Sequence, residues 1–186
     1  MNRTSGFSVR TLVHAAMFTA VISVLSQIAI PMPGGVPITL QTLAIALCAY
    51  TLGWKTGLLS TITYVLLGAV GVPVFANFMG GFNVLIGVTG GFIWGFLPMT
   101  ALCGLGMAID KPVRSISMGI AGLLVCHAIG ILQFSLVTQG TLINSAMVAS
   151  LPYIIKDVVC VVGAYYMARV LRRTRALRIT PEQYRK

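Results

Sequence analysis

Residues 89–137 read TGGFIWGFLPMTALCGLGMAIDKPVRSISMGIAGLLVCHAIGILQFSLV. Two apolar runs, 89–109 and 115–137, flank a short break that carries three charged residues and a proline (110–114). A helix needs ~20 mostly apolar residues to cross a bilayer, and each run has that length. This stretch therefore predicts two transmembrane helices joined by a short polar connection.

Similar apolar runs, bounded by glycine and proline, occupy most of the remaining chain. The pattern predicts an all-α, multi-pass membrane protein, a bundle of six transmembrane helices in one domain over residues 1–173, with a basic tail at 174–186. The first run has the length of a span and no cleavage pattern after it, so it is assigned as a helix and not as a signal peptide. The four further runs are 11–30, 38–52, 57–70 and 151–171, of which the second and third are short for a span.

The composition agrees with this class. Of the 186 residues, 57% are hydrophobic and 9% are charged, whereas soluble domains carry about 25% charged residues. Such a chain cannot cover a water-facing surface, which excludes a soluble enzyme, a nucleic-acid-binding module and a secreted disulfide scaffold. The four cysteines lie within apolar runs and are interpreted as small core residues.

The charges also predict the orientation. The chain has 13 Lys and Arg against 3 Asp and Glu. Basic residues occur before the first run, at Lys55, in the 110–114 break and in the tail, whereas the connections 31–37, 71–88 and 138–150 contain no charge. By the positive-inside rule, both termini face the cytoplasm and the uncharged connections face outward, in a cell membrane.

Two of the uncharged segments are rich in Gly and Pro yet contain aromatic and amide side chains. Irregular backbone at membrane depth is tolerated where it is buried or lines a cavity, so 31–42 and 71–91 predict an outward-facing pocket with apolar walls. Tight turns at the lipid headgroups are the alternative. The segment at 138–150 is interpreted as a plain loop. The pocket residues expected from these segments are Thr39, Gln41, Phe75, Asn77, Thr89 and Gly90.

One ionisable pair stands inside the last run. Lys156 and Asp157 lie about a turn or more into it, close to Tyr153 and Cys160. A charge at the bilayer centre costs ~2.5–3.5 kcal/mol and usually faces a cavity or a partner. A ligand-binding carboxylate at the outer end of the bundle is the functional interpretation, and a local ion pair at the membrane boundary is the alternative. His14 and His127 are interpreted as hydrogen-bonded packing residues and not as metal ligands, and no catalytic set, metal site or cofactor motif is evident.

Four stretches carry a family resemblance: VPITLQTLA (36–44), GLLSTITYVLLGAVGVPVFANFMGG (57–81), GVTGGFIWGF (87–96) and LPYIIKD (151–157). They resemble the BioY family, the biotin-specific S components of energy-coupling factor (ECF) vitamin transporters. The resemblance implies a six-helix S component that captures biotin, as transported ligand and not as cofactor. Its implied partners are a transmembrane T component and two cytosolic ATPases, so the chain itself would not be an enzyme.

The resemblance also assigns residues. It implies that Ala16 and Ala20 dock on the T component and that Asp157 binds the ureido end of the ligand. Cys160 stands where the family has a lysine, and Lys156 stands where it often has glycine. A biotin precursor or another small cyclic vitamin is therefore an alternative ligand. A self-sufficient oligomeric carrier or channel and an intramembrane enzyme are the alternative functions.

The orientation is directly testable. Single cysteines at Gly35 and Asn144, in a chain lacking the four native cysteines, should react with an impermeant maleimide on intact cells. Both positions lie in connections without charge. Labelling that appears only after permeabilisation would reverse the topology.

Overall fold

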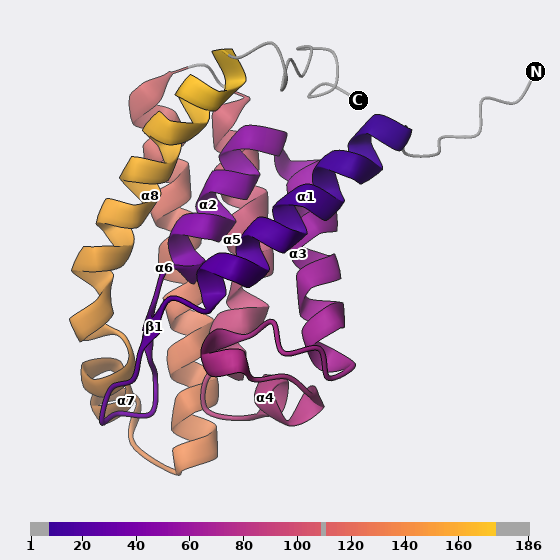
Figure 1. Cartoon of the computed structure of the whole chain (residues 1–186). Coiled ribbons are helices and arrows are strands. Elements are labelled where there is room, and N and C mark those ends of the chain that lie inside the picture. Colours follow the sequence, from indigo (N-terminus) through magenta and orange to yellow (C-terminus); the bar gives the residue numbers. More distant parts are fainter. Residues whose placement is uncertain (1–7, 109–110, 174–186) are drawn as a thin grey trace, which may run out of the picture.

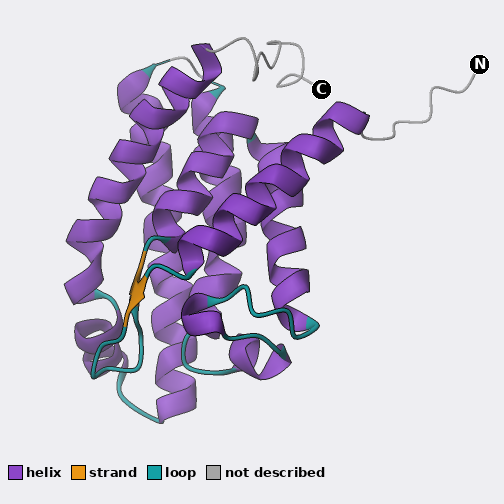
Figure 2. Cartoon of the chain, in the orientation of Figure 1, coloured by secondary structure: helices purple, strands orange, loops and turns teal. Residues whose placement is uncertain are grey.

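The computed structural model describes residues 8–108 and 111–173, and helices make up most of it (Figure 2). The predicted mostly helical fold is confirmed. Six long helices correspond to the six apolar runs: α1 (Val9–Ser26), α2 (Gln41–Leu52), α3 (Trp54–Ala69), α5 (Gly90–Met107), α6 (Pro112–Thr138) and α8 (Leu151–Arg173). The smaller elements are β1 (Ala29–Ile30), β2 (Ile38–Thr39), a 3-10 turn (Ala76–Phe78), α4 (Phe82–Ile86) and α7 (Leu142–Ala149).

By length and composition, three of the described helices, α1, α5 and α6, can each cross a membrane. A fourth span results if α7 and α8, which meet at a bend of 52°, are taken together. The short α2 is nearly all buried, and α1, α3, α5 and α8 pack around it (Figure 1). A helix that is apolar on every side is buried in a core or spans a membrane, and α2 lies in the interior of the bundle.

The structure corrects two predicted boundaries. The first helix ends at Ser26 and not at residue 30, because Ala29 and Ile30 form an antiparallel pair with Ile38 and Thr39. The prolines within 31–37 lack an N–H donor and cannot continue a helix, so the chain reverses there as a hairpin. The 138–150 connection is also not a plain loop, since it contains α7.

Among the described helices, α5 and α6 make the most extensive contact, and glycines on α5 lie within it. A methyl group at Gly95 would lie 2.7 Å from Cα of Cys126, and one at Gly91 would lie 2.6 Å from the backbone oxygen of Ile129. Helices in a membrane associate mainly through such close packing. These glycines therefore set how near α6 comes to the rest of the bundle.

The two ends of the bundle differ in charge. The start of α1, the α2–α3 connection, the end of α5, the start of α6 and the end of α8 all lie at one end of the bundle (Figure 1, top). The described residues of the opposite end, in 27–40, 70–89 and 139–150, include no charged side chain. Lys156 and Asp157 are the only described charges well away from the basic end, so the connections predicted to face opposite sides do lie at opposite ends.

The helix contact predicts a matched pair of substitutions. Gly95→Ala should lower the stability of the protein by about 1–3 kcal/mol because the methyl group overfills the α5–α6 contact. Gly163→Ala on α8 should be neutral or slightly stabilising, since nothing lies within 4 Å of the added methyl group. Thermal unfolding in detergent measures both. Equal stability of the two variants would contradict the packing described here.

Candidate functional site

A pocket of about 680 Å³, including the space at its mouth, lies toward the uncharged end of the bundle. Its lining comes from the hairpin, the 75–89 segment and the ends of α2, α5 and α8 nearest that end, together with α6. The walls include Val84, Phe92, Ile93, Phe96 and Leu123, and the polar groups are Thr39, Gln41, Thr42, Thr89, Cys126, His127, Tyr153, Lys156 and Asp157.

Most of the residues predicted for the site are brought together here. Thr39, Gln41, Phe75, Thr89, Tyr153, Lys156 and Asp157 line the pocket.

Three residues of the predicted set are placed elsewhere. Asn77 is exposed in a turn, Gly90 is buried at the start of α5, and Cys160 is buried on α8 outside the lining. Ala16 and Ala20 are both exposed, on α1.

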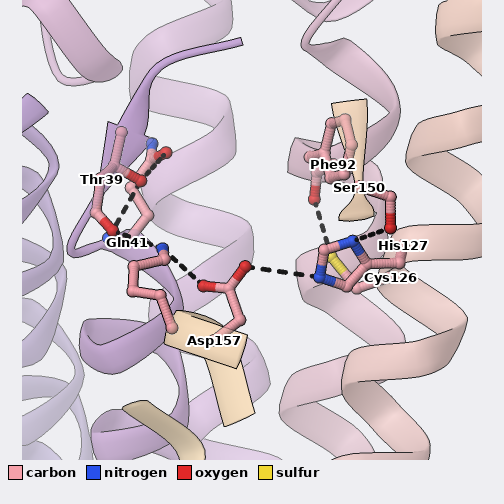
Figure 3. Close-up of polar contacts among 8 residues, drawn as sticks. Thr39, Gln41, Phe92, Cys126, His127, Ser150 and Asp157 are labelled. Atoms are coloured by element: carbon pink, nitrogen blue, oxygen red, sulfur yellow. Dashed lines mark hydrogen bonds and ion pairs between the residues drawn. The ribbon is translucent and has the colours of Figure 1, made fainter. Parts of the chain in front are cut away.

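Asp157 is the only acidic residue among those that the structure describes, and its side chain is 7% exposed. The Lys156 ammonium forms a close ion pair with Oδ1. On the other side, Nε2 of His127 lies 3.4 Å from Oδ2 (Figure 3). Despite the ion pair, Oδ1 makes no well-directed hydrogen bond within the described part of the chain. The carboxylate is therefore balanced in charge yet still able to accept a donor from a ligand.

The sequence predicted His127 to be a hydrogen-bonded packing residue, and it is buried and hydrogen-bonded, but its contact with Asp157 was not predicted. Its Nδ1 is also bonded to the Ser150 hydroxyl at 2.8 Å. A signal for this pairing exists in the sequence. His127 is the only ionisable side chain in the 115–137 run apart from the cysteine, and Asp157 is the only acidic residue in any run. Ionisable groups in membrane helices usually pair with one another.

The hairpin is fastened to α8 across the pocket. The Tyr153 hydroxyl donates to the backbone oxygen of Val36 at 2.6 Å, and Lys156 donates to the backbone oxygen of Thr39 at 2.8 Å. Both acceptors are on the segment that the prolines turn back. Because Lys156 contacts Thr39 and Asp157 together, the position of the hairpin and the charge of the site depend on the same side chain.

Gln41 has its amide bonded within the protein. Its nitrogen donates to the Tyr64 hydroxyl at 2.8 Å, and its oxygen accepts from the Thr39 hydroxyl at 3.1 Å. The Tyr64 hydroxyl is also 3.0 Å from the Ser26 hydroxyl on α1. This network ties the floor of the pocket to α1 and α3, so Gln41 has a structural task that the sequence did not reveal.

The 71–81 segment supplies the aromatic wall. Phe75 is 1% exposed and packs edge-on against Tyr64, with 5.5 Å between the ring centres. The segment is held by Gln27, which donates to the backbone oxygen of Val74 and accepts from the N–H of Phe78. Asn77 and Phe78 both have positive φ, as in the tight turn of a two-residue hairpin. This turn carries Asn77 to the surface while it keeps Phe75 inside.

These features define a class: a membrane-embedded helical bundle with a pocket lined by apolar side chains and a single buried carboxylate. The BioY family profile matches residues 1–177, and the chain belongs to the BioY family.

Its relatives include the biotin transporter BioY of Thermotoga maritima, 40% identical over 166 residues that cover 88% of this chain and 96% of the relative. The probable biotin transporter BioY of Pyrococcus horikoshii is 38% identical over 158 residues, covering 84% and 93%. Among solved structures, the S-component for biotin from an ECF-type ABC transporter superposes with a TM-score of 0.85 over the whole of both chains at 24% identity. That likeness shows the fold.

Proposed function

We propose that this protein is the substrate-binding S component of an ECF-type transporter and captures biotin from the outer side of the cell membrane for ATP-driven uptake. The observation that carries the proposal is the buried Asp157 carboxylate in an otherwise apolar pocket of a BioY family member. The names of the two relatives described above support biotin as the ligand.

Biotin joins a cyclic urea to an apolar ring and an acidic chain, and the pocket has a counterpart for the urea and for the ring. The ureido N–H groups donate to Asp157, since a charge-assisted hydrogen bond is strong in a dry site. Phe75, Phe92 and Tyr153 enclose the ring system. Lys156 supplies the cation of the site from the position before Asp157, whereas Cys160, where the family has a lysine, lies outside the lining.

The proposed orientation follows from the charges. The six helices that match the six apolar runs cross the membrane. Both termini face the cytoplasm, and the uncharged end with the pocket faces outward. Lys156 and Asp157 compensate each other, so the closed pocket holds no net charge from this pair. That arrangement limits the cost of placing ionised groups below the outer surface.

Transport requires partners under this proposal. A T component and two cytosolic ATPases supply the coupling and the ATP hydrolysis, and the chain needs no cofactor of its own. The docking surface on the T component includes Ala16 and Ala20, whose exposed small side chains let another helix approach closely.

Asp157→Asn tests the ligand site. It keeps the size of the side chain but removes the charge, and loss of such a hydrogen bond costs ~1.5–3 kcal/mol, roughly 10- to 150-fold in biotin affinity. Titration calorimetry in detergent measures the change. Cys160→Ser, one turn further along α8 and outside the pocket, is the control and should bind normally. Unchanged binding by Asp157→Asn would mean that the carboxylate is structural.

A second variant separates capture from coupling. Ala16→Leu with Ala20→Leu should bind biotin normally, yet fail to co-purify with the T component and the ATPases and fail to support uptake. Ala121→Leu with Ala128→Leu changes two exposed alanines on α6 and is the control. It should bind biotin, co-purify with the partners and support uptake. Normal uptake by the α1 variant, or loss of its biotin binding, would refute the docking assignment.

A further inference from the structure

His127 contacts Asp157 from the side opposite to Lys156. Its side chain is 6% exposed, it comes from α6, and its Nε2 faces Oδ2 while Lys156 occupies Oδ1. At 3.4 Å the contact is longer than an ordinary hydrogen bond of about 2.7–3.2 Å. It nevertheless places a donor beside the oxygen that the lysine does not contact.

The two neighbours of the His127 ring, Asp157 and Ser150, match the two ring nitrogens of a neutral imidazole. An ionised carboxylate can only accept, so the proton of a neutral imidazole belongs on Nε2. Nδ1 then accepts from the Ser150 hydroxyl, 2.8 Å away. Ser150 lies at the bend between α7 and α8 and its backbone oxygen accepts from the N–H groups of Tyr153 and Ile154 at the start of α8. The backbone of Ser150 is thus joined to the start of α8, the helix that carries Asp157.

We infer that His127, whose ring is held in place through Nδ1 by Ser150, is a positioning residue that orients the Asp157 carboxylate toward the ureido group of the ligand. The inference rests on the proposed function, because it takes biotin as the ligand. A donor beside each oxygen, from two different helices, restrains the plane of the carboxylate. An ionised carboxylate has about four acceptor sites, so acceptor sites remain for a ligand.

Two substitutions of His127 separate its two contacts. The amide nitrogen of glutamine reaches about as far as Nε2, whereas the shorter asparagine reaches only as far as Nδ1. His127→Gln therefore keeps a donor toward Asp157 and loses the Ser150 contact, and His127→Asn does the reverse. By titration calorimetry, His127→Gln should bind biotin within about threefold of the wild type, and His127→Asn about 5- to 30-fold more weakly.

A double-mutant cycle distinguishes positioning from general support of the fold. In an Asp157→Asn background, His127→Asn should cause no further loss of affinity, because the group on which it acts is gone. Equal losses in both backgrounds, or equal affinity of the Gln and Asn variants, would overturn the inference. Failure of the wild-type chain to bind biotin would instead overturn the proposed function.

If His127→Asn does not fold, Ser150→Ala carries the same test. It removes the hydrogen bond to Nδ1 that holds the imidazole ring in place beside Asp157. Biotin affinity should fall in the wild-type background and stay unchanged in the Asp157→Asn background. A loss of the same size in both backgrounds would again contradict the positioning role.

Discussion

The structure depends on one constraint, which is that a carboxylate buried in a membrane protein needs compensation from nearby groups. Asp157 has no other acidic residue near it among the described residues, and its side chain is almost fully enclosed. An uncompensated charge in such a place is costly. Lys156 supplies the countercharge and His127 a donor, and the elements around the pocket are arranged so that both reach it.

The helix packing serves this arrangement. Gly91 and Gly95 let α6 approach α5 closely, and His127 is on the same helix as the residues they contact. Lys156 and Tyr153 hold the hairpin over the pocket by donating hydrogen bonds to its backbone oxygens. The same two α8 residues therefore shape the wall and the polar end of the site.

The helices could be predicted from the sequence because burial in a bilayer requires long apolar runs and charge accumulates on one side. The hairpin at 29–39 could not, because Ala29 and Ile30 continue an apolar run and only pairing with β2 ends the helix before them. Asp157 was predicted to face a cavity or a partner because an ionised group inside the membrane is otherwise costly. The contact of His127 with Asp157 was not predicted, because the two residues are far apart in sequence and only the packing of α6 against α8 brings them together. The exposure of Asn77 was not predicted, because the tight turn that contains it is held by Gln27, a contact made across the fold.

Under the proposed function, Asp157 recognises the ureido group of biotin within this pocket. The most direct measurement is an X-ray structure of the chain with biotin bound. The account predicts that the ureido ring lies between α6 and α8, with an N–H within ordinary hydrogen-bond distance, about 2.7–3.2 Å, of a carboxylate oxygen of Asp157. Density for biotin with the ureido ring directed away from Asp157, or at a site outside the pocket, would contradict it.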